Sequence, residues 1–279
     1  MKFYCIYIKE DDSVRLLKEA CAKRKIPFIQ LDPENYDYTQ RIRFSKRDML
    51  YRVVTTSSGR DLEKFLLDRN VSTFYRSYER SVSSISNILV YEKEDIPRPK
   101  TIYRLTRNKK LLQKYAEKLG FPLIIKAMGG SHGVGILKID SLSSLYSISD
   151  YLLSKGPGSF VMKEFVDVTS SARLIVLGNK VIDSIKYLAP ENDFRSNEGA
   201  VPNVTKASFP KNIEKIATRT VKALGVEFGG VDILISKSGK PYVAEMNFPC
   251  FFPRCQMLTG TDIAGKMIDH LAKKTTVRN

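Results

Sequence analysis

The 279-residue sequence has no tryptophan, only two histidines and only four cysteines. Four cysteines in a chain of this length do not make a disulfide scaffold, so we expect a reducing compartment. Cys250 and Cys255 lie close together, but the absence of a CxxC pair and the scarcity of histidine argue against a zinc site. We interpret both as packing or loop residues rather than catalytic thiols.

Long apolar runs are also missing. No stretch approaches the length of about 20 apolar residues that crosses a bilayer as a helix. The apolar run at the N-terminus, MKFYCIYIKE, is short and soon followed by charge, unlike the apolar segment of a secretory signal. These features predict a cytoplasmic protein without a membrane partner.

Positive charge is in excess along the whole chain. Lys and Arg number 46 against 30 Asp and Glu, a formal charge of +16. The first 110 residues hold 24 basic against 15 acidic side chains, and the remainder holds 22 against 15. Such a balance favours acidic partners, including phosphates and acidic peptides. A solvated basic surface without a partner is the alternative.

The pattern of the first 95 residues predicts a small α/β layer with a parallel sheet, because short apolar runs alternate with amphipathic segments. The expected elements are strands at 3–8, 28–31, 50–55 and 74–75, and helices from Ser13 (as N-cap) to Pro27, over 61–69 and over 83–93. The segment 94–100 (EDIPRPK) contains two prolines and predicts an extended linker.

Beyond the linker, helices and strands are mixed. We expect helices at 108–119 (closed by Gly120), 141–153, 213–224 and 262–273, strands at 123–126, 135–139, 160–166, 172–177 and 180–187, and a hairpin at 230–247. The chain is therefore divided into three predicted parts, 1–95, 96–160 and 161–279.

A glycine-rich loop follows Lys126 in the segment KAMGGSHGVG. Four glycines in seven positions leave backbone N–H groups free to approach a phosphate, and the lysine adds a positive charge. The loop is not a P-loop, because no Gly-Lys-Ser/Thr follows. A flexible hairpin loop with a surface lysine is the alternative.

A second polar segment reads FRSN over residues 194–197. The guanidinium of Arg195 could fork onto a phosphate, and the amide of Asn197 could bind a phosphate oxygen or a metal. Four residues also suit an ordinary surface turn.

The segment GVDILISKSGKPYVAEMN predicts a hairpin with a two-residue turn at Ser238-Gly239. This turn places Asp232 opposite Glu245 and Ile235 opposite Tyr242. Directly opposed residues have Cβ atoms about 5 Å apart, so the two carboxylates are expected to face each other.

Asn247 lies two residues beyond Glu245 and therefore points to the same face as the carboxylates. Leu234 and Val243 are expected on this face as well, so that Asp232 and its partner are partly buried. Facing carboxylates need a cation or another partner. Oxygen ligands suit Mg²⁺ or Mn²⁺. A solvated acid pair on an edge hairpin is the alternative.

Residues 97–272 resemble the ATP-grasp fold, and specifically the RimK-type amino-acid ligases. The matching segments, in order, are PLIIKAMGGSHGVGI, VMKEFV, SARLIVLGNKVI, NDFRSN, ALGVEFGGVDIL, AEMN and LTGTDIA. The implied α/β fold has two α+β subdomains that grip ATP, a smaller lid over 96–160 and a larger one over 161–279 with the Mg²⁺ site. The first 95 residues resemble, in architecture only, the Rossmann-like domain that precedes the grasp.

The resemblance implies a role for each matching residue. Asp232, Glu245 and Asn247 match the metal ligands, while Lys126 and Arg195 match residues that offset charge during phosphoryl transfer. The implied nucleotide-binding residues are Lys126, Gly130, Ser131, His132, Gly133, Gly135, Lys163, Glu164, Phe165, Arg173, Arg195 and Asn197. Of these, Glu164 and Phe165 match the hinge whose backbone groups bind adenine. His132 could touch a phosphate, but it is better explained as an exposed loop residue.

The sequence departs from the family at several positions. Many members have Asp where this chain has Ser171, and a second phosphate-binding lysine where it has Ser83-Ser84. The segment EGAVPN lacks the usual Gly-Gly pair. After Asn247, the segment 249–254 (PCFFPR) replaces a common Pro-Gly turn. Substrate identity therefore does not carry over from the family.

The implied reaction is ATP-dependent amide or peptide bond formation through an acyl phosphate, giving ADP and phosphate. Its expected substrates are an amino acid, such as glutamate, and a peptide, protein or small acid. Two alternatives stay open: an ATP-grasp kinase acting on an alcohol, and a non-enzymatic module that binds nucleotide or nucleic acid. A nucleic-acid partner is not our expectation, and a homo-oligomer is expected by analogy alone.

Overall fold

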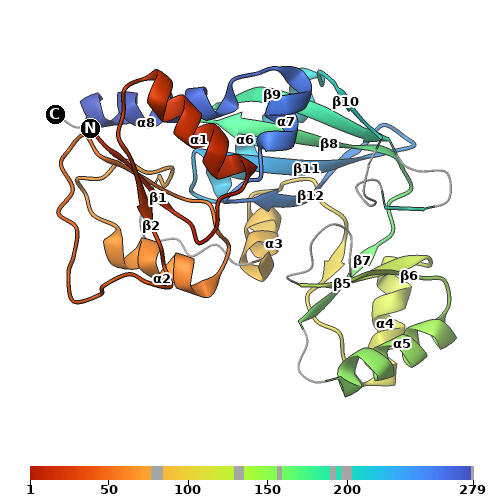
Figure 1. Cartoon of the computed structure of the whole chain (residues 1–279). Coiled ribbons are helices and arrows are strands. Elements are labelled where there is room, and N and C mark those ends of the chain that lie inside the picture. The colour runs from red at the N-terminus through yellow and green to blue at the C-terminus, as the bar shows by residue number, and fades with distance from the viewer. Residues whose placement is uncertain (77–83, 129–134, 156–158, 189–192, 196–202, 278–279) are drawn as a thin grey trace.

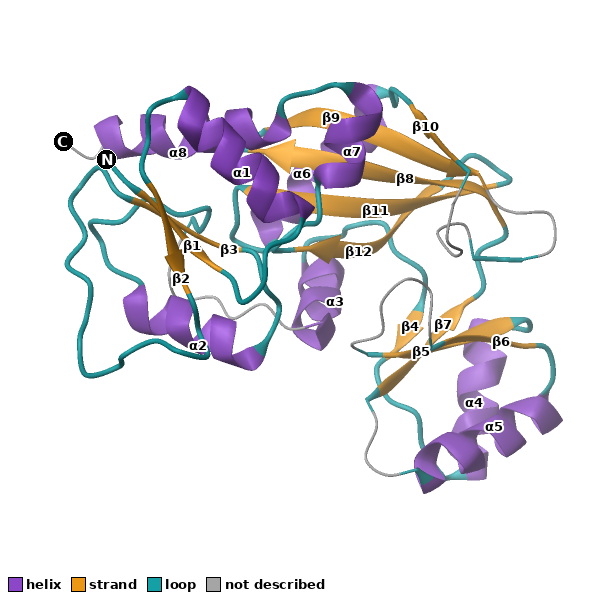
Figure 2. Ribbon diagram, viewed as in Figure 1, coloured by secondary structure: helices purple, strands orange, loops and turns teal. Residues whose placement is uncertain are grey.

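The computed structural model describes residues 1–76, 84–128, 135–155, 159–188, 193–195 and 203–277. Three sheets follow one another along the chain (Figure 1). The first lies beside the long third sheet, and the second forms a separate layer with its own two helices (Figure 2).

The first sheet is parallel, as the alternation of strands and helices predicted. Its strands are β1 (Phe3–Ile6), β2 (Phe28–Leu31) and β3 (Met49–Arg52), in the order β2-β1-β3. The helices of this region are α1 (Asp12–Lys23), α2 (Ser57–Leu66) and α3 (Ser84–Lys93). The predicted strand at 74–75 is wrong: Tyr75 makes a single antiparallel bridge with Val226.

Two helices in this region begin where a polar side chain caps them, and not where the apolar pattern suggested. Asp11, rather than the predicted Ser13, caps α1, because its Oδ1 accepts a hydrogen bond from the N–H of Val14 at 2.9 Å. Helix α2 begins at Ser57, earlier than predicted, since the hydroxyl of Thr56 caps its first turn.

The second sheet is antiparallel and carries both of its helices on one face (Figure 2). It contains β4 (Thr101–Ile102), β5 (Leu123–Ala127), β6 (Ile136–Ile139) and β7 (Phe160–Glu164), in the order β4-β7-β5-β6, and is covered by α4 (Lys109–Leu119) and α5 (Leu142–Ser154). Asn108 and Gly120 cap α4, and the glycine has the predicted role, with a φ of 80°. The short β4 was not predicted.

The third sheet is antiparallel and carries a helix layer on each face. Its strands are β8 (Val168–Leu177), β9 (Lys180–Leu188), β10 (Val204–Lys206), β11 (Phe228–Ser236) and β12 (Pro241–Asn247), in the order β10-β9-β8-β11-β12. Helix α6 (Lys211–Ala223) packs on one face, and α7 (Pro253–Thr259) and α8 (Ile263–Val277) cover part of the other. Neither β10 nor α7 was predicted.

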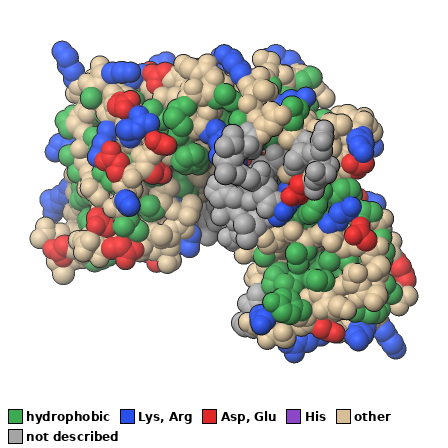
Figure 3. All heavy atoms as spheres, turned by 45° about the vertical axis from the view of Figure 1, so that its right-hand side comes forward, with side chains coloured by type: hydrophobic (Ala, Val, Ile, Leu, Met, Phe, Trp, Pro, Cys, Tyr) green, Lys and Arg blue, Asp and Glu red, His purple; other side chains and the backbone are tan. Residues whose placement is uncertain are grey.

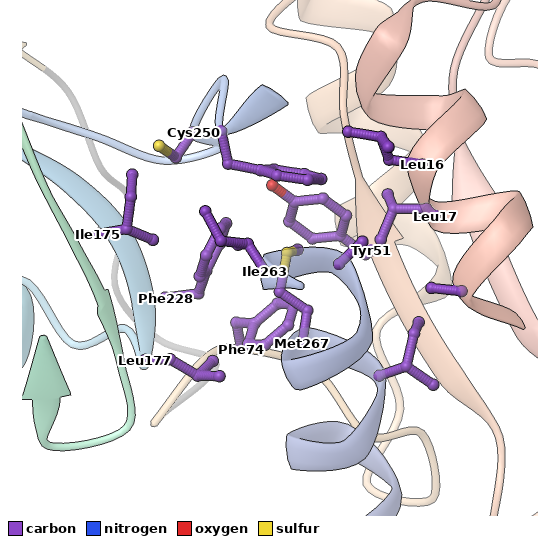
Figure 4. Packing of buried hydrophobic residues seen from close by; sticks show 14 of the residues in the cluster. Leu16, Leu17, Tyr51, Phe74, Ile175, Leu177, Phe228, Cys250, Ile263 and Met267 are labelled. Atoms are coloured by element: carbon purple, nitrogen blue, oxygen red, sulfur yellow. The ribbon is translucent and has the colours of Figure 1, made fainter. Parts of the chain in front are cut away.

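One buried cluster joins the beginning of the chain to its end (Figure 4). Leu17 of α1 and Tyr51 of β3 meet Met267 of α8, while Phe228 and Ile175 enter from the third sheet. The first and third sheets therefore share a hydrophobic core. The three predicted domains stay a prediction; β7, which begins at residue 160, pairs with β5 in the second sheet.

The structure shows the state of the cysteines and the placement of the basic side chains. All four cysteines are free and buried, and burial raises the pKa of Cys250 to about 12, so its thiol stays protonated. Basic side chains are scattered over the face in Figure 3 and do not gather in one patch. None of the helices in the described part of the chain has the length and apolar character needed to cross a bilayer.

Glu227 links α8 to the rest of the core through contacts with two basic side chains of that helix. Its Oε2 lies 3.1 Å from Nε2 of His270 and accepts a hydrogen bond from Nζ of Lys274 at 2.8 Å. The same ammonium donates to the carbonyls of Thr73 and Tyr75. Burial alone would raise the pKa of Glu227, but its hydrogen bonds with the two basic side chains outweigh this and lower the pKa to about 2.

We predict that this cluster makes stability depend on pH in the acid range. The folded-state pKa of Glu227 lies below its ordinary value of 4.5, so the stabilisation is complete above pH 4.5 and disappears as pH falls through about 2. Glu227→Gln should lower the free energy of unfolding at neutral pH by about 3 kcal/mol and flatten its decline between pH 4.5 and 2. Urea denaturation across this range measures both effects; an unchanged decline in the variant would contradict the assignment.

Candidate active site

The two predicted carboxylates face each other on the third sheet. Asp232 of β11 pairs directly with Glu245 of β12, as the hairpin turn predicted. The amide nitrogen of Asn247 lies 3.3 Å from Oδ2 of Asp232 and 3.3 Å from Oε1 of Glu245. The three side chains therefore converge on one spot near the edge of the sheet.

The hairpin register shifts immediately after this pair. Ile233 is opposite Val243, and Ile235 is opposite Pro241 rather than the predicted Tyr242. This bulge turns the side chain of Val243 into the core beside Ile233, so the prediction that it shares the face of the acids was wrong. A register derived from the turn alone contains no signal for a bulge within the strand.

Each carboxylate has a basic partner from a different element. Arg173 of β8 holds Asp232 in a bidentate pair, with Nε–Oδ1 at 2.8 Å and Nη2–Oδ2 at 2.7 Å. Nζ of Lys126, at the end of β5, lies 2.6 Å from Oε2 of Glu245. The Lys126–Glu245 contact joins the second sheet to the third.

These contacts shift the ionisation of the groups involved. Attraction to Asp232 holds the pKa of Arg173 well above its usual value. Burial alone would raise the pKa of Glu245, but attraction to Lys126 and the hydrogen bond from it keep that pKa low. The pKa of Lys163 on β7 falls to about 8, mainly because of burial and then because of the positive charge of Lys126. The site therefore combines two carboxylates with the basic side chains of Arg173, Lys126 and Lys163.

The predicted adenine hinge lies at the end of β7. The N–H of Glu164 donates to the carbonyl of Lys100 at 3.0 Å, and its Oε1 accepts from the N–H of Lys100 at 2.9 Å. The ring of Phe165 lies against the ring of Phe194, with centroids 6.2 Å apart, and Nζ of Lys138 lies over its face. The predicted hinge therefore follows β7, and the linker residue Lys100 holds the end of that strand.

Arg195 is paired locally. Its N–H donates to Oδ1 of Asp193 at 2.9 Å, and its Nη2 lies 2.8 Å from Oδ2 of the same residue. The structure does not bring it into contact with the Asp232–Glu245 pair.

Gly135 is the first described residue at the end of the glycine-rich segment. Its φ is +83°, and a Cβ at this position would lie only 2.9 Å from the Cβ of Ala127. Both the backbone conformation and the close approach therefore require glycine. Gly130, Ser131, His132, Gly133 and Asn197 lie outside the described residues.

Other side chains near the site were missed by sequence reasoning. Burial, followed by the charge of Glu245, raises the pKa of Tyr91, a buried tyrosine of α3. Arg98 of the linker is close enough to Lys163 to lower its pKa. Neither residue belongs to a motif, and only the packing of α3 and the linker against the sheets brings them near.

The donor set suits a hard divalent cation. Two carboxylates and an amide oxygen are ligands that Mg²⁺ prefers, and the opposed strands present them together. The described part of the chain contains no group of three or more His, Cys, Asp or Glu side chains that could hold a metal, and at this site two carboxylates are joined by an amide. The residues present therefore fit the cation that the motifs predicted.

Solved structures with the same architecture define the fold. The ATP-grasp ligase PsnB, complexed with a phosphomimetic variant of its minimal precursor, Mg and ADP, is similar with a TM-score of 0.76 at 16% identity, covering 98% of both chains. D-alanine–D-alanine ligase from Bacillus anthracis is similar with a TM-score of 0.69 at 17% identity, covering 100% of this chain and 98% of that one. The chain therefore has the ATP-grasp fold.

Sequence comparison gives the family. The model of the RimK-like ATP-grasp domain matches residues 83–271. The chain belongs to this family, which confirms the resemblance seen in the motifs. A curated relative, the probable alpha-L-glutamate ligase of Trichodesmium erythraeum, is 33% identical over 159 residues, covering 55% of this chain and 52% of the relative. The chain thus spans about half the length of the curated relatives it matches.

We predict that Arg173→Met strongly destabilises the fold, because it leaves Asp232, whose side chain is only 13% exposed, without its partner. The free energy of unfolding should fall by about 3–5 kcal/mol, and added Mg²⁺ should restore part of the loss. The matched control is Lys237→Met in the β11–β12 turn, which breaks an exposed pair with Asp167 before β8 and should cost less than about 1 kcal/mol. Urea denaturation of both variants, with and without Mg²⁺, measures the difference; equal losses would contradict the prediction.

Proposed function

We propose that this chain is an ATP-dependent carboxylate–amine ligase that forms an amide or peptide bond through an acyl phosphate. The observation that carries the proposal is the convergence of Asp232, Glu245 and Asn247 with Lys126 and Arg173 around them. Membership of the RimK-like ATP-grasp family supports it.

In the proposed reaction, an oxygen of the donor carboxylate bonds to the γ-phosphorus of ATP as the bond to ADP breaks. The nitrogen of the acceptor amine then bonds to the acyl carbon, phosphate leaves, and the amine loses a proton to solvent. No nucleophilic Ser or Cys of the protein is needed. Positioning of the reactants and neutralisation of charge account for the rate.

Asp232, Glu245 and Asn247 would hold Mg²⁺, which supplies charge neutralisation at the phosphate oxygens when it is bound. Lys126 would exchange its contact with Glu245 for the phosphates, and Arg195 would exchange part of its contact with Asp193. Backbone groups at Glu164 and Phe165 would read adenine. Arg173 would keep Asp232 in place beneath the site.

For substrates, we propose an acidic amino acid such as glutamate and an acceptor that is a peptide, a protein tail or a small acid. The relatives are described as probable alpha-L-glutamate ligases, and PsnB has been solved in complex with a precursor peptide, which supports this choice. The excess of positive charge suits acidic substrates. A cytoplasmic location and a homo-oligomer stay predictions.

The test is release of ADP and phosphate from Mg-ATP in the presence of pooled amino acids and short acidic peptides. We expect release that requires both a carboxylate and an amine, and that falls about a hundredfold or more in Glu245→Gln because a metal ligand is lost. The control is Glu19→Gln, in which an exposed carboxylate on α1 that pairs with Arg15 is changed in the same way.

Three outcomes would contradict the ligase proposal. ADP with a phosphoester and no free phosphate would indicate a kinase. Nucleic-acid binding with steep salt dependence and no turnover would indicate a binding module. Equal release by Glu245→Gln and the wild type would remove the carboxylate pair from the mechanism.

A further inference from the structure

The linker between α3 and β4 is attached to two sheets at once. The carbonyl of Pro97 accepts a hydrogen bond from the N–H of Val243 on β12 at 2.7 Å. Lys100 forms two hydrogen bonds with Glu164 at the end of β7. Arg98 lies between these attachments. The linker therefore places this residue between the strand that carries Glu245 and the strand that leads to the hinge.

One N–H group of the Arg98 guanidinium has no hydrogen-bond acceptor in the described part of the chain. Its Nη2 lies 3.3 Å from Oε1 of Glu92, whose other oxygen accepts from the hydroxyl of Tyr103. Its Nε is buried and has no hydrogen-bond acceptor in the described part of the chain, although the side chain is 23% exposed. Since a buried N–H without an acceptor is unfavourable, a ligand that offers oxygen atoms here would remove a cost as well as add a contact.

Arg98 adds a third positive charge near Lys126 and Lys163. Lys126 and Arg98 both lower the pKa of Lys163, which means that the three cations lie near one another, with Glu245 as the opposing carboxylate. Lys126 already contacts that carboxylate. An anion with several charges, such as the polyphosphate of a nucleotide, fits this imbalance.

The sequence also lacks the cation that many members of the family place early in the helix before the linker, where this chain has Ser83-Ser84. We propose that Arg98 supplies this second phosphate-binding cation: it is held by Glu92 in the free protein and forks onto phosphate oxygens when nucleotide binds. This inference rests on the proposed function, since it requires that ATP occupies the site.

The test is calorimetric titration of the full chain with Mg-ATP, Mg-ADP and adenosine. Arg98→Gln should raise the Kd for Mg-ATP and Mg-ADP by about tenfold or more and leave the Kd for adenosine unchanged, because adenosine has no phosphate. Arg98→Lys keeps the charge without the fork and should show a smaller increase. The charge-matched control is Arg104→Gln, which changes an exposed arginine just beyond β4 and should bind all three ligands like the wild type.

A second variant acts on the exposed partner and leaves Arg98 intact. Glu92→Gln removes the competing carboxylate, so binding of Mg-ATP should be equal to or tighter than that of the wild type. Three results would each overturn the role of Arg98. Arg98→Gln could bind Mg-ATP with wild-type affinity, or it could lose ATP and adenosine binding in equal proportion. The third such result is weaker binding of Mg-ATP by Glu92→Gln. A wild-type chain that binds no nucleotide at all would instead overturn the proposed function, and this inference with it.

Discussion

Two carboxylates held face to face on neighbouring strands repel each other unless positive charge lies between or beside them, and the arrangement of this protein depends on that constraint. Asp232 and Glu245 are directly opposed on β11 and β12. Their partners come from elsewhere: Arg173 from the adjacent strand β8 and Lys126 from the second sheet. The same charge that the fold must balance is what makes the site able to accept a divalent cation and phosphate.

The two basic side chains differ in how readily they can leave their carboxylates. Arg173 is held to Asp232 by two short hydrogen bonds within one sheet, and its planar guanidinium matches the carboxylate with both of them. Among the described residues, Lys126 makes one hydrogen bond, across two sheets and from the end of a strand, and it lies near Lys163, whose pKa is lowered to about 8. We infer that Arg173 positions the site, whereas Lys126 is available to a ligand that enters between the sheets.

Much of this could be predicted from the sequence, because the informative signals are local. A two-residue turn was enough to pair Asp232 with Glu245, and Asn108 and Gly120 marked the ends of a helix. The bulge that follows Asp232, the short elements β10 and α7, and the approach of Arg98 to Lys163 depend on packing between distant segments, and no local pattern encodes them. The motifs identified the family, whereas the linker that joins two sheets became visible only in three dimensions.

The most direct test of the central claim is Mn²⁺ binding followed by electron paramagnetic resonance, with ADP present, because Mn²⁺ accepts the same oxygen ligands as Mg²⁺. If the facing carboxylates form the metal site, the wild type will immobilise Mn²⁺ at one site, and Asp232→Asn combined with Glu245→Gln will abolish the bound signal while the protein stays folded. A bound signal that persists in the folded double variant, or its absence in the wild type with ADP, would contradict the account.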